Sequence, residues 1–381
     1  YLHTRTRPDI FSGYRWRLDA MYKTAFTLSH RRSSISFIVA CLCTTILFLS
    51  ACKPVEKKHN YSVFAFGTLI DVTLYATDQQ LADNAFNQLQ KLFDKHHHDW
   101  SPWTNGDLAQ LNKKLKTQTT ASVPPHLIPI IQTSIRLSQQ SDNYYNPAIG
   151  HLINLWQFHK YQDNNVRPPD HDQIKNLIKM NPQMSDLIFS TDKQITNTNP
   201  AVMLNFGAFA KGYAIKLGLE HLQTLGIHSA VINAGGDLSV IGQHDDRAWN
   251  IGIRHPRNEK ILASVEVRNN ESVFTSGDYE RAYTFQSKRF HHILDPKTGY
   301  PATDMQSVTV IHTDAGLADA AATALFVAGR KDWYKIAKKM DIHQVMLIDA
   351  DGDIHLTPDM KNRLNFRNKS PTSRIMVSKE L

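Results

Sequence analysis

The chain has 381 residues, of which 41% are hydrophobic and 20% charged, so it is globular in composition and long enough to bury an ample core. The formal net charge is +8, but residues 1–51 hold seven Lys/Arg against two Asp, which leaves 36 of the 43 basic and 33 of the 35 acidic residues for the rest. This balance does not predict the basic face that nucleic-acid binding requires, so we expect no nucleic-acid partner.

An export signal is predicted at the N-terminus. Arg31 and Arg32 precede an uncharged apolar run over residues 35–51, and Cys52 follows directly. A basic segment, an apolar segment and small residues before a cleavage point are typical of a secretory signal. The ending Leu-Ser-Ala-Cys resembles the lipobox of bacterial lipoproteins, in which the cysteine carries the lipid. An uncleaved membrane anchor is the alternative, because the run nearly spans a bilayer.

The cysteines agree with a lipid anchor. Cleavage before Cys52 removes Cys41 and Cys43, and lipid occupies Cys52, so the mature chain would have no free thiol and no disulfide. We expect a periplasm-facing protein on a bacterial membrane, with the inner membrane favoured over the outer. The expected parts are a signal region over 1–51 (starting at Met21 if the signal has conventional length), a lipidated cysteine and polar tether over 52–60, a folded domain over 61–358 and a polar, mobile tail over 359–381.

The pattern of apolar residues predicts strands and helices without a regular βαβ rhythm, which indicates an α+β fold formed by a single compact domain of mixed sheets with packed helices. The predicted helices lie over 78–98, 126–141, 206–225 and 315–328, and residues 159–172 are loop-like. The predicted strands lie at 68–76, 248–254, 261–268, 272–276, 288–294 and 308–312. Residues 229–242 predict strand–turn–strand or a bulge, and residues 346–356 predict a hairpin with an Asp-Gly turn.

Two segments of the predicted helices could carry chemistry. Asp319 and Thr323 are spaced i, i+4, so a carboxylate and a hydroxyl share one face. Oxygen ligands are what Mg²⁺ requires, although a polar edge on an Ala-rich helix explains this pair more simply when it is taken alone. Lys211 lies among small apolar residues, where a lysine needs an anionic partner unless it extends outward into solvent.

Three further groups are polar. Gly235, Gly236 and Asp237 permit a close backbone approach to a ligand, or form a bulge. A cluster with a general base is predicted from two polar turns, which hold Thr275, Ser276, Asp278, His292 and Asp295. The triplet at residues 96–98 suggests zinc, but consecutive histidines cannot all point the same way, so a solvated helix end is the favoured interpretation.

Together and in this order, eight segments resemble the ApbE family, the periplasmic FAD:protein FMN transferases. They read FGTLIDVTLY, WSPWTNGDLAQLN, YNPAIGHLINLWQF, LNFGAFAKGYA, INAGGDLSVIG, TSGDYERAY, HHILDPKTGYP and SVTVIHTDAGLADAAATALFVAG. They span about residues 61–329, so the resemblance implies that the folded domain is a flavin transferase domain.

The resemblance also implies roles for single residues. A magnesium site would use Asp319, Thr323 and the backbone at Ala208 and Ala322, and the family's required histidine matches His292. Contacts with the flavin nucleotide would come from Phe66, Trp103, Tyr144, Tyr145, Asn146, Asn205, Lys211 and Leu294. The chain departs from the family where it has Asn146 and Asn205 in place of the usual Asp, Phe66 in place of Met, and Lys216 in place of a frequent Asp.

The activity implied is Mg²⁺-dependent transfer of FMN from FAD to a Thr or Ser hydroxyl of an acceptor protein through a phosphoester bond, with release of AMP. His292 or Asp278 would help to deprotonate the hydroxyl, and both remain candidates. The implied acceptors are flavin-carrying subunits of membrane redox complexes of the sodium-translocating NADH:quinone oxidoreductase type. The alternatives are an Mg²⁺-dependent FAD pyrophosphatase that yields FMN and AMP, and a non-catalytic flavin-binding lipoprotein.

Overall fold

The computed structural model describes residues 56–117, 119–160, 163, 165–190, 193–243, 247–367 and 373–381. The predicted signal region and residues 52–55, which include Cys52 and the start of the predicted tether, lie outside the described residues. The rest of the tether is not a tether, because strand β1 (Lys57–Ala65) begins at Lys57 and pairs along its whole length with β2 (Thr68–Ala76).

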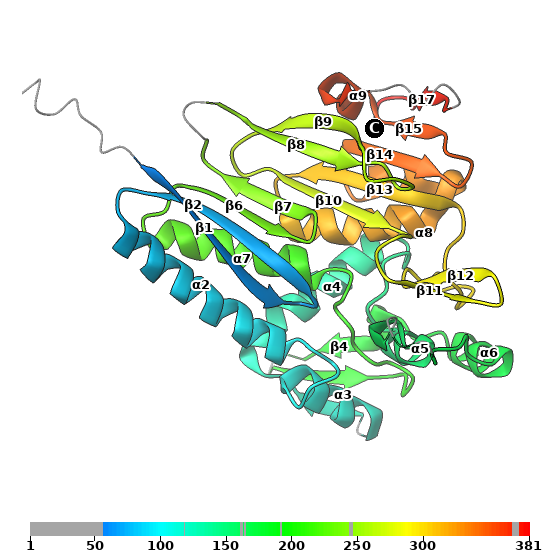
Figure 1. Cartoon of the computed structure of the whole chain (residues 1–381). Coiled ribbons are helices and arrows are strands. Elements are labelled where there is room, and N and C mark those ends of the chain that lie inside the picture. Colours follow the sequence, from blue (N-terminus) through cyan, green and yellow to red (C-terminus); the bar gives the residue numbers. More distant parts are fainter. Residues whose placement is uncertain are drawn as a thin grey trace, which may run out of the picture. The chain divides into compact units, whose positions relative to one another are not determined.

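A nine-stranded sheet forms the centre of the described part (Figure 1). Its neighbours are antiparallel, except that the last two strands run parallel. In spatial order the strands after β1 and β2 are β6 (Ser229–Ala234), β7 (Asp237–Ile241), β10 (Ser272–Gly277), β13 (Met305–His312), β14 (Gln344–Asp349), β15 (Ile354–Leu356) and β17 (Ile375–Val377).

Both faces of this sheet are covered, so its strands alternate between two apolar cores. Along β14, Val345 and Leu347 pack into the core on the helical side, whereas Met346 and Ile348 pack into the opposite core. The helical layer consists of α2 (Gln79–Asp99), α4 (Ile128–Gln140), α7 (Ala210–Thr224) and α8 (Ala315–Lys339). The other layer consists of a three-stranded sheet, β8 (Trp249–Arg254), β9 (Ile261–Val267) and β16 (Asn365–Phe366), with helix α9 (Pro358–Arg363).

Smaller elements surround a third core that contains Trp156, Phe290 and Leu294. It is built by α5 (Gly150–Trp156), the 3₁₀ turn η2 (Phe158–Lys160), α6 (His171–Met180) and the hairpin of β11 (Ala282–Phe285) and β12 (Lys288–His291). The remaining elements are α3 (Asp107–Thr117), β3 (Thr120–Ser122), η1 (Pro125–Leu127), η3 (Met184–Asp186), β4 (Leu187–Phe189) and β5 (Gln194–Asn197).

The α+β class and most of the long predicted elements are confirmed, including the hairpin with an Asp-Gly turn. The predicted helix over 206–225 begins only at Ala210, because residues 206–209 form a turn in which the Ala210 N–H bonds to the Phe206 carbonyl at 2.7 Å. The predicted helix over 315–328 ends where Gly329 takes a non-helical φ of 66°, after which helix α8 resumes. Between β6 and β7, Gly235 and Gly236 form a two-residue turn with positive φ at both positions, so strand–turn–strand is the correct alternative.

The predicted mobile tail is wrong where the structure describes it. Met360 on α9 is fully buried in the second core, and β17 adds a strand to the edge of the central sheet. Arg374 also pairs with the Asp353 carboxylate at 2.6 Å. The polar composition of this segment therefore reflects one solvent-facing side rather than a lack of structure.

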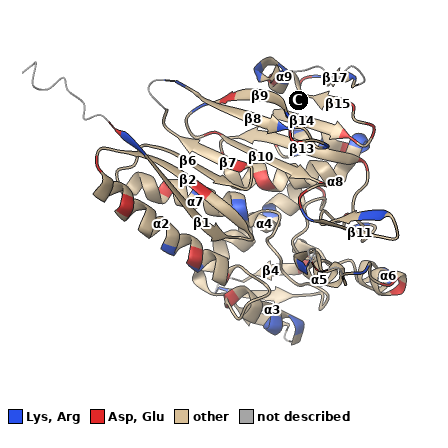
Figure 2. Ribbon diagram, viewed as in Figure 1, with Lys and Arg blue, Asp and Glu red and all other residues tan. Residues whose placement is uncertain are grey.

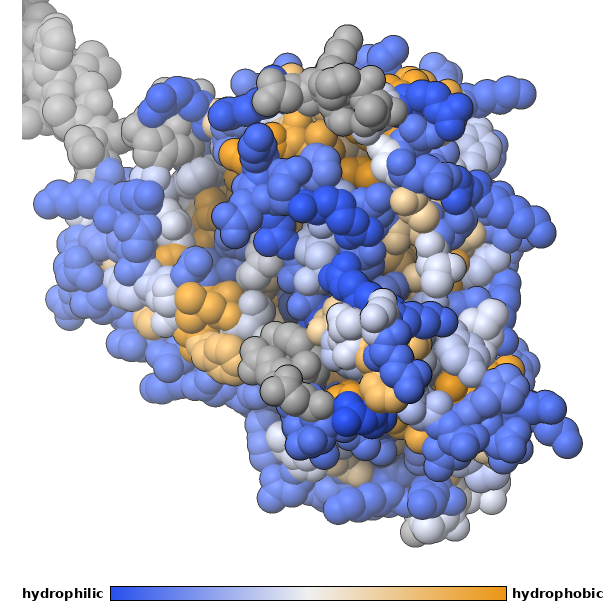
Figure 3. Space-filling model, turned by 45° about the vertical axis from the view of Figure 1, so that its right-hand side comes forward, coloured by the Kyte–Doolittle hydropathy of each residue, from blue (hydrophilic) through white to orange (hydrophobic). Residues whose placement is uncertain are grey.

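The surface of the described part mixes charges of both signs (Figure 2). On the face in Figure 3, hydrophilic residues predominate and the apolar residues form separate patches. None of the described helices combines the length and the apolar character needed to cross a bilayer.

Replacement of Met360 by Ala is expected to lower the free energy of unfolding by about 2–5 kcal/mol, because it leaves a cavity in the second core. The matched control is Met376→Ala, since Met376 is 38% exposed on β17, and a change there should stay within about 0.5 kcal/mol. Urea denaturation of the purified variants measures both values. Equal stability of the two variants would show that α9 does not contribute to the core.

Candidate active site

A partly buried lysine between two aspartates lies where the helical layer meets the central sheet. Lys211 is the second residue of α7, and its Nζ lies 3.1 Å from Asp237 Oδ2 and 3.6 Å from Asp319 Oδ1. Burial lowers the pKa of Lys211, but the two carboxylates outweigh this effect and hold it above its usual value. Lys211 is therefore charged and has anionic partners, which confirms that interpretation over an outward-extending side chain.

The backbone holds both carboxylates in place. Asp237 begins β7, and its Oδ1 accepts the N–H of Thr275 on β10 at 2.8 Å. Asp319 on α8 accepts the N–H of Gly212 on α7 at 2.9 Å. Residue 212 must be glycine, because a Cβ there would lie 2.2 Å from the Ala315 carbonyl oxygen. The close crossing of the two helices thus brings the lysine and the carboxylate together.

Oxygen donors surround this cluster. Thr323 lies one turn after Asp319 on α8, and its Oγ1 is 3.1 Å from the hydroxyl of Ser276 on β10. Burial raises the pKa of Asp319, Lys211 lowers it and Asp237 raises it, and the net direction is upward. A buried carboxylate with incomplete compensation and nearby hydroxyls is a donor set that suits a hard cation such as Mg²⁺. The residues present therefore fit the metal that the resemblance implies.

Of the two backbone positions expected near this metal, one lies just before α7 and the other lies on α8. Ala208 belongs to the turn before α7, and Ala322 is buried on α8 immediately before Thr323. The side chains of both are methyl groups, so only their carbonyl oxygens can serve as ligands.

The two consecutive histidines after β11 have different environments. His291 is buried, its Nε2 lies 2.7 Å from the Ala302 carbonyl, and its Nδ1 accepts the N–H of Ile293 at 3.3 Å. His292 is half-buried, and its Nδ1 is enclosed without a hydrogen-bond partner. Burial, together with Arg281 and His291 nearby, lowers the pKa of His292 to about 3, so its imidazole is neutral. Only His292 thus retains an imidazole nitrogen that is free for chemistry.

The turn after these histidines has the predicted shape. Asp295 Oδ1 accepts the Lys297 N–H at 2.8 Å, the Gly299 N–H bonds to the Asp295 carbonyl at 2.8 Å, and Gly299 has a φ of 76°. Leu294, which precedes the turn, is buried in the third core.

Asp278, the other candidate base, is occupied. Arg257 donates to both of its carboxylate oxygens at 2.7 Å, and Arg289 Nη1 lies 3.8 Å away. Thr275 and Ser276 lie in strand β10, which confirms the strand predicted over 272–276, and not in the polar turn that was also predicted for them. A strand position suits them, since it directs Ser276 towards Thr323.

Phe66 and Trp103 occupy different surroundings. Phe66 has a φ of 52°, its N–H bonds to His97 Nδ1 at 3.1 Å, and Arg281 Nη2 lies 3.5 Å from its carbonyl oxygen. Arg281 also lowers the pKa of Lys211 and the pKa of His292. Trp103 is 40% exposed and stacks on His159 with ring centroids 5.0 Å apart.

The two neighbouring tyrosines point in different directions. The Tyr144 hydroxyl donates to Asp332 at 2.6 Å, and Lys297 Nζ lies 3.9 Å from its ring centroid. The Tyr145 ring is buried in the main core, where its hydroxyl lies 3.2 Å from the Ser134 hydroxyl. Of the two predicted flavin contacts, only Tyr144 has a ring at the edge of the core.

The two amides at the positions where the resemblance implies aspartate are buried and lie on neighbouring segments. Asn146 donates from Nδ2 to the Pro182 carbonyl at 2.9 Å and accepts the Ala148 N–H at 3.0 Å. Asn205 Oδ1 accepts the Gly207 N–H at 2.8 Å, and the Asn205 N–H bonds to the Pro147 carbonyl at 2.9 Å. Lys216, at another position of departure, forms an ion pair with Asp314 at 2.7 Å.

The structure shows residues of this site that the sequence predicts only in part or not at all. Asp237 was noted beside a glycine pair without a role, yet it is the nearer partner of Lys211. Arg281 was missed, and no signal in the linear sequence marks it, because its neighbours come from distant segments. The sequence feature that points to Asp237 is Lys211, because a lysine among small apolar residues requires a carboxylate partner.

The chain matches known proteins over most of its length. The model of the ApbE family matches residues 66–347. An FAD:protein FMN transferase of Rhodobacter capsulatus is 37% identical over 305 residues, which are 79% of this chain and 57% of that protein. The chain thus spans little more than half of that relative. An FAD:protein FMN transferase of Klebsiella pneumoniae is 28% identical over 81% of this chain and 95% of its own length.

Solved structures show the same fold. The ApbE protein of Thermotoga maritima superposes with a TM-score of 0.74 at 26% identity, covering 82% of this chain and all of that one. The flavinyl transferase ApbE of Pseudomonas stutzeri, in its apo form, gives a TM-score of 0.68 at 24% identity over 79% of this chain and 93% of its own. The matched region includes the partly buried lysine, both of its aspartates and His292, and the chain belongs to the ApbE family.

Proposed function

We propose that this protein transfers FMN from FAD to a hydroxyl group of an acceptor protein. Membership of the ApbE family and the names of its relatives support the reaction class. The observation that carries the proposal is the charged, partly buried Lys211 between Asp237 and Asp319, with Thr323 one turn after Asp319 and its hydroxyl next to that of Ser276. A charged ammonium and hard oxygen ligands in one place suit a pyrophosphate.

The substrate would place its pyrophosphate against this cluster. Lys211 would contribute positive charge to the phosphate oxygens, and the carboxylates of Asp237 and Asp319 fix its position. Mg²⁺ held by Asp319, Thr323 and the carbonyls of Ala208 and Ala322 would offset the phosphate charge and polarise the phosphorus. Positioning and electrostatics would then supply most of the rate, as in other phosphoryl transfers.

The chemical step is a displacement at the FMN-side phosphorus. The Thr or Ser oxygen of the acceptor forms a bond to this phosphorus, the P–O bond to the AMP portion breaks, and AMP leaves with that oxygen. The proton of the acceptor hydroxyl passes to the imidazole of His292, which is neutral. The negative charge of a bound pyrophosphate would raise the low pKa of His292 towards a useful value. Asp278 is the weaker candidate because Arg257 holds both of its oxygens.

We also propose where the protein works and on what. The lipobox-like segment ending at Cys52 supports a lipid anchor on the periplasmic side of a bacterial membrane, with the inner membrane favoured. The acceptors would be flavin-carrying subunits of membrane redox complexes of the sodium-translocating NADH:quinone oxidoreductase type.

Incubation of the purified protein with FAD, Mg²⁺ and such an acceptor tests the proposal. We expect flavin fluorescence on the acceptor in a denaturing gel, with release of AMP in equal amount. Free FMN and AMP without a labelled acceptor would show hydrolysis instead. FAD that binds but stays intact would contradict both FMN transfer and FAD hydrolysis.

Replacement of Asp319 by Ala should lower Mg²⁺-dependent transfer about 10²–10³-fold and leave the fold intact. Lys211 keeps Asp237 as a partner in this variant, so no buried charge is left alone. The control is Asp341→Ala, which removes a carboxylate from the surface pair with His343. Turnover and thermal unfolding are measured for both. Full activity of Asp319→Ala would rule out the proposed metal site.

Replacement of His292 by Ala should lower turnover about 10²–10⁴-fold, since it removes the general base. Asp278→Asn should change turnover only a few-fold, because its carboxylate serves Arg257 rather than the substrate. Transfer rates at saturating FAD and acceptor are compared for the two variants. A larger loss in Asp278→Asn would reverse the assignment of the base.

A further inference from the structure

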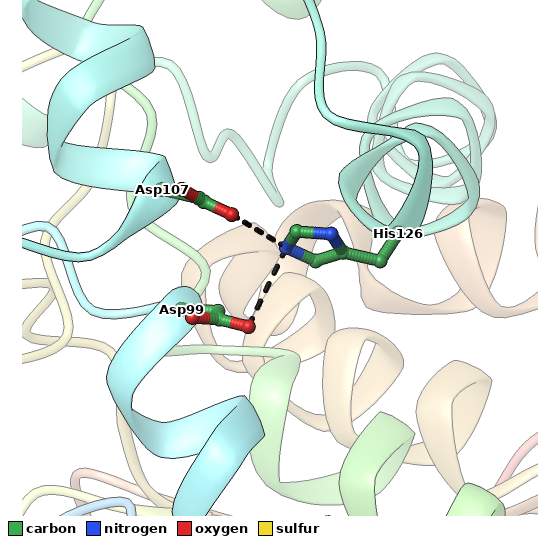
Figure 4. A group of neighbouring side chains, drawn as sticks. All are labelled: Asp99, Asp107 and His126. Atoms are coloured by element: carbon green, nitrogen blue, oxygen red, sulfur yellow. Dashed lines mark ion pairs between the residues drawn. The ribbon is translucent and has the colours of Figure 1, made fainter.

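A second group of metal-ligating side chains lies apart from the lysine cluster. His126 Nε2 points at two carboxylates and lies 3.1 Å from Asp107 Oδ2 and 3.5 Å from Asp99 Oδ2 (Figure 4). One ligand atom from each of the three residues fits within 4.8 Å of the others. The residues come from three elements, since Asp99 ends α2, Asp107 begins α3 and His126 lies in η1.

A tight loop brings the two aspartates together. Between α2 and α3 the chain folds back, so that a Cβ at Gly106 would lie 2.1 Å from the His98 carbonyl oxygen. The Thr104 hydroxyl donates to the same carbonyl at 3.1 Å and accepts the Gly106 N–H at 3.2 Å. The end of one helix and the start of the next are therefore fixed beside each other, with His126 facing both.

The imidazole nitrogen of His126 lacks the partner that its burial requires. Its Nε2 is fully enclosed and, although two carboxylate oxygens are close, makes no hydrogen bond with any described residue. A buried polar atom without a partner is costly. A bound cation would remove this cost, because it accepts the lone pair of a neutral imidazole.

The spacing of the donors matches a metal shell. Bonds of about 2.0–2.2 Å to nitrogen and oxygen place adjacent ligands roughly 3.0–3.4 Å apart, and the separations from His126 to the two aspartates are 3.1 and 3.5 Å. Lys95 pairs with Asp99 at 2.5 Å. Two carboxylates therefore face one lysine, which leaves an excess of negative charge for a divalent ion.

We propose that Asp99, Asp107 and His126 bind a divalent transition-metal ion of the Zn²⁺ type. An imidazole nitrogen in the ligand set favours such an ion over Mg²⁺, which prefers oxygen ligands alone. The ion would tie the end of α2, the start of α3 and η1 together, and would thereby hold the loop that carries Trp103. The site does not depend on the flavin transferase activity, because it shares no residue with the lysine cluster.

Binding of Zn²⁺ alone to the purified, chelator-treated protein tests this proposal by calorimetry. We expect a Zn²⁺ site in the wild type that is retained in Asp319→Ala and absent in His126→Gln. The matched control is His343→Gln, which alters a surface histidine that faces a single carboxylate, Asp341, at 2.9 Å and should retain the site. Equal Zn²⁺ binding by His126→Gln and the wild type, or no binding by the wild type, would overturn the proposal.

Thermal unfolding gives a second readout. Zn²⁺ should raise the Tm of the wild type and of Asp319→Ala, because an ion that binds only the folded state stabilises it, and should not raise the Tm of His126→Gln. If His126→Gln does not fold, Asp107→Asn replaces it, since that side chain is 37% exposed and the change conserves its shape. An unchanged Zn²⁺ response in Asp107→Asn would show that the three residues form an ion pair only.

Discussion

The position of Lys211 is the constraint on which the rest of the molecule depends. Its ammonium joins Asp237 of the central sheet to Asp319 of the helical layer. Each carboxylate is in turn fixed by a backbone N–H of another element, Thr275 on β10 or Gly212 on α7. Removal of Lys211 would leave both carboxylates without their counter-charge, which is strongly destabilising. The same contacts thus hold the two layers together and create a charged, preorganised site.

The cluster of Lys211, Asp237 and Asp319 can bind a further cation. Two carboxylates surround one ammonium, and burial raises the pKa of Asp319, so the protein itself does not fully stabilise the ionised form. A cation near Asp319 and Thr323 would complete the compensation, and the hydroxyl of Ser276 adds an oxygen at the same place. The same balance of positive and negative charge therefore determines both the stability of this site and its ability to bind a cation.

Local patterns in the sequence predicted the parts of the fold that depend on local physics. The apolar stripes of α2 and α4, the alternation of β2 and the i, i+4 spacing of Asp319 and Thr323 are visible in single segments. The short elements α5 and α6 and the tail helix α9 were not, because a few apolar residues such as Met360 secure them through tertiary packing. The pairing of Lys211 with Asp237 also requires the sheet, which brings together residues with no periodic relation.

The histidines also show that contacts between residues far apart in the chain cannot be predicted from local sequence patterns. Residues 96–98 attract attention because they are consecutive, yet His96 stacks on Trp100 and His97 accepts the N–H of Phe66, so the two imidazoles serve different contacts. The expectation that they would not point the same way is confirmed, although only His98 is exposed. The histidine that faces two carboxylates is His126, and only the folded loop after α2 reveals it.

The amides at the positions where the resemblance implies aspartate have unequal consequences. Asn205 accepts the Gly207 N–H through Oδ1, and a carboxylate can accept the same bond. Asn146 also donates from Nδ2 to the Pro182 carbonyl, and a carboxylate there would place two acceptor oxygens against each other in a buried site. In this chain the amide at position 146 is therefore part of the local structure, whereas the amide at position 205 mainly removes a negative charge. A return to aspartate should be tolerated at 205 and resisted at 146, because only the second change leaves a buried acceptor without its donor.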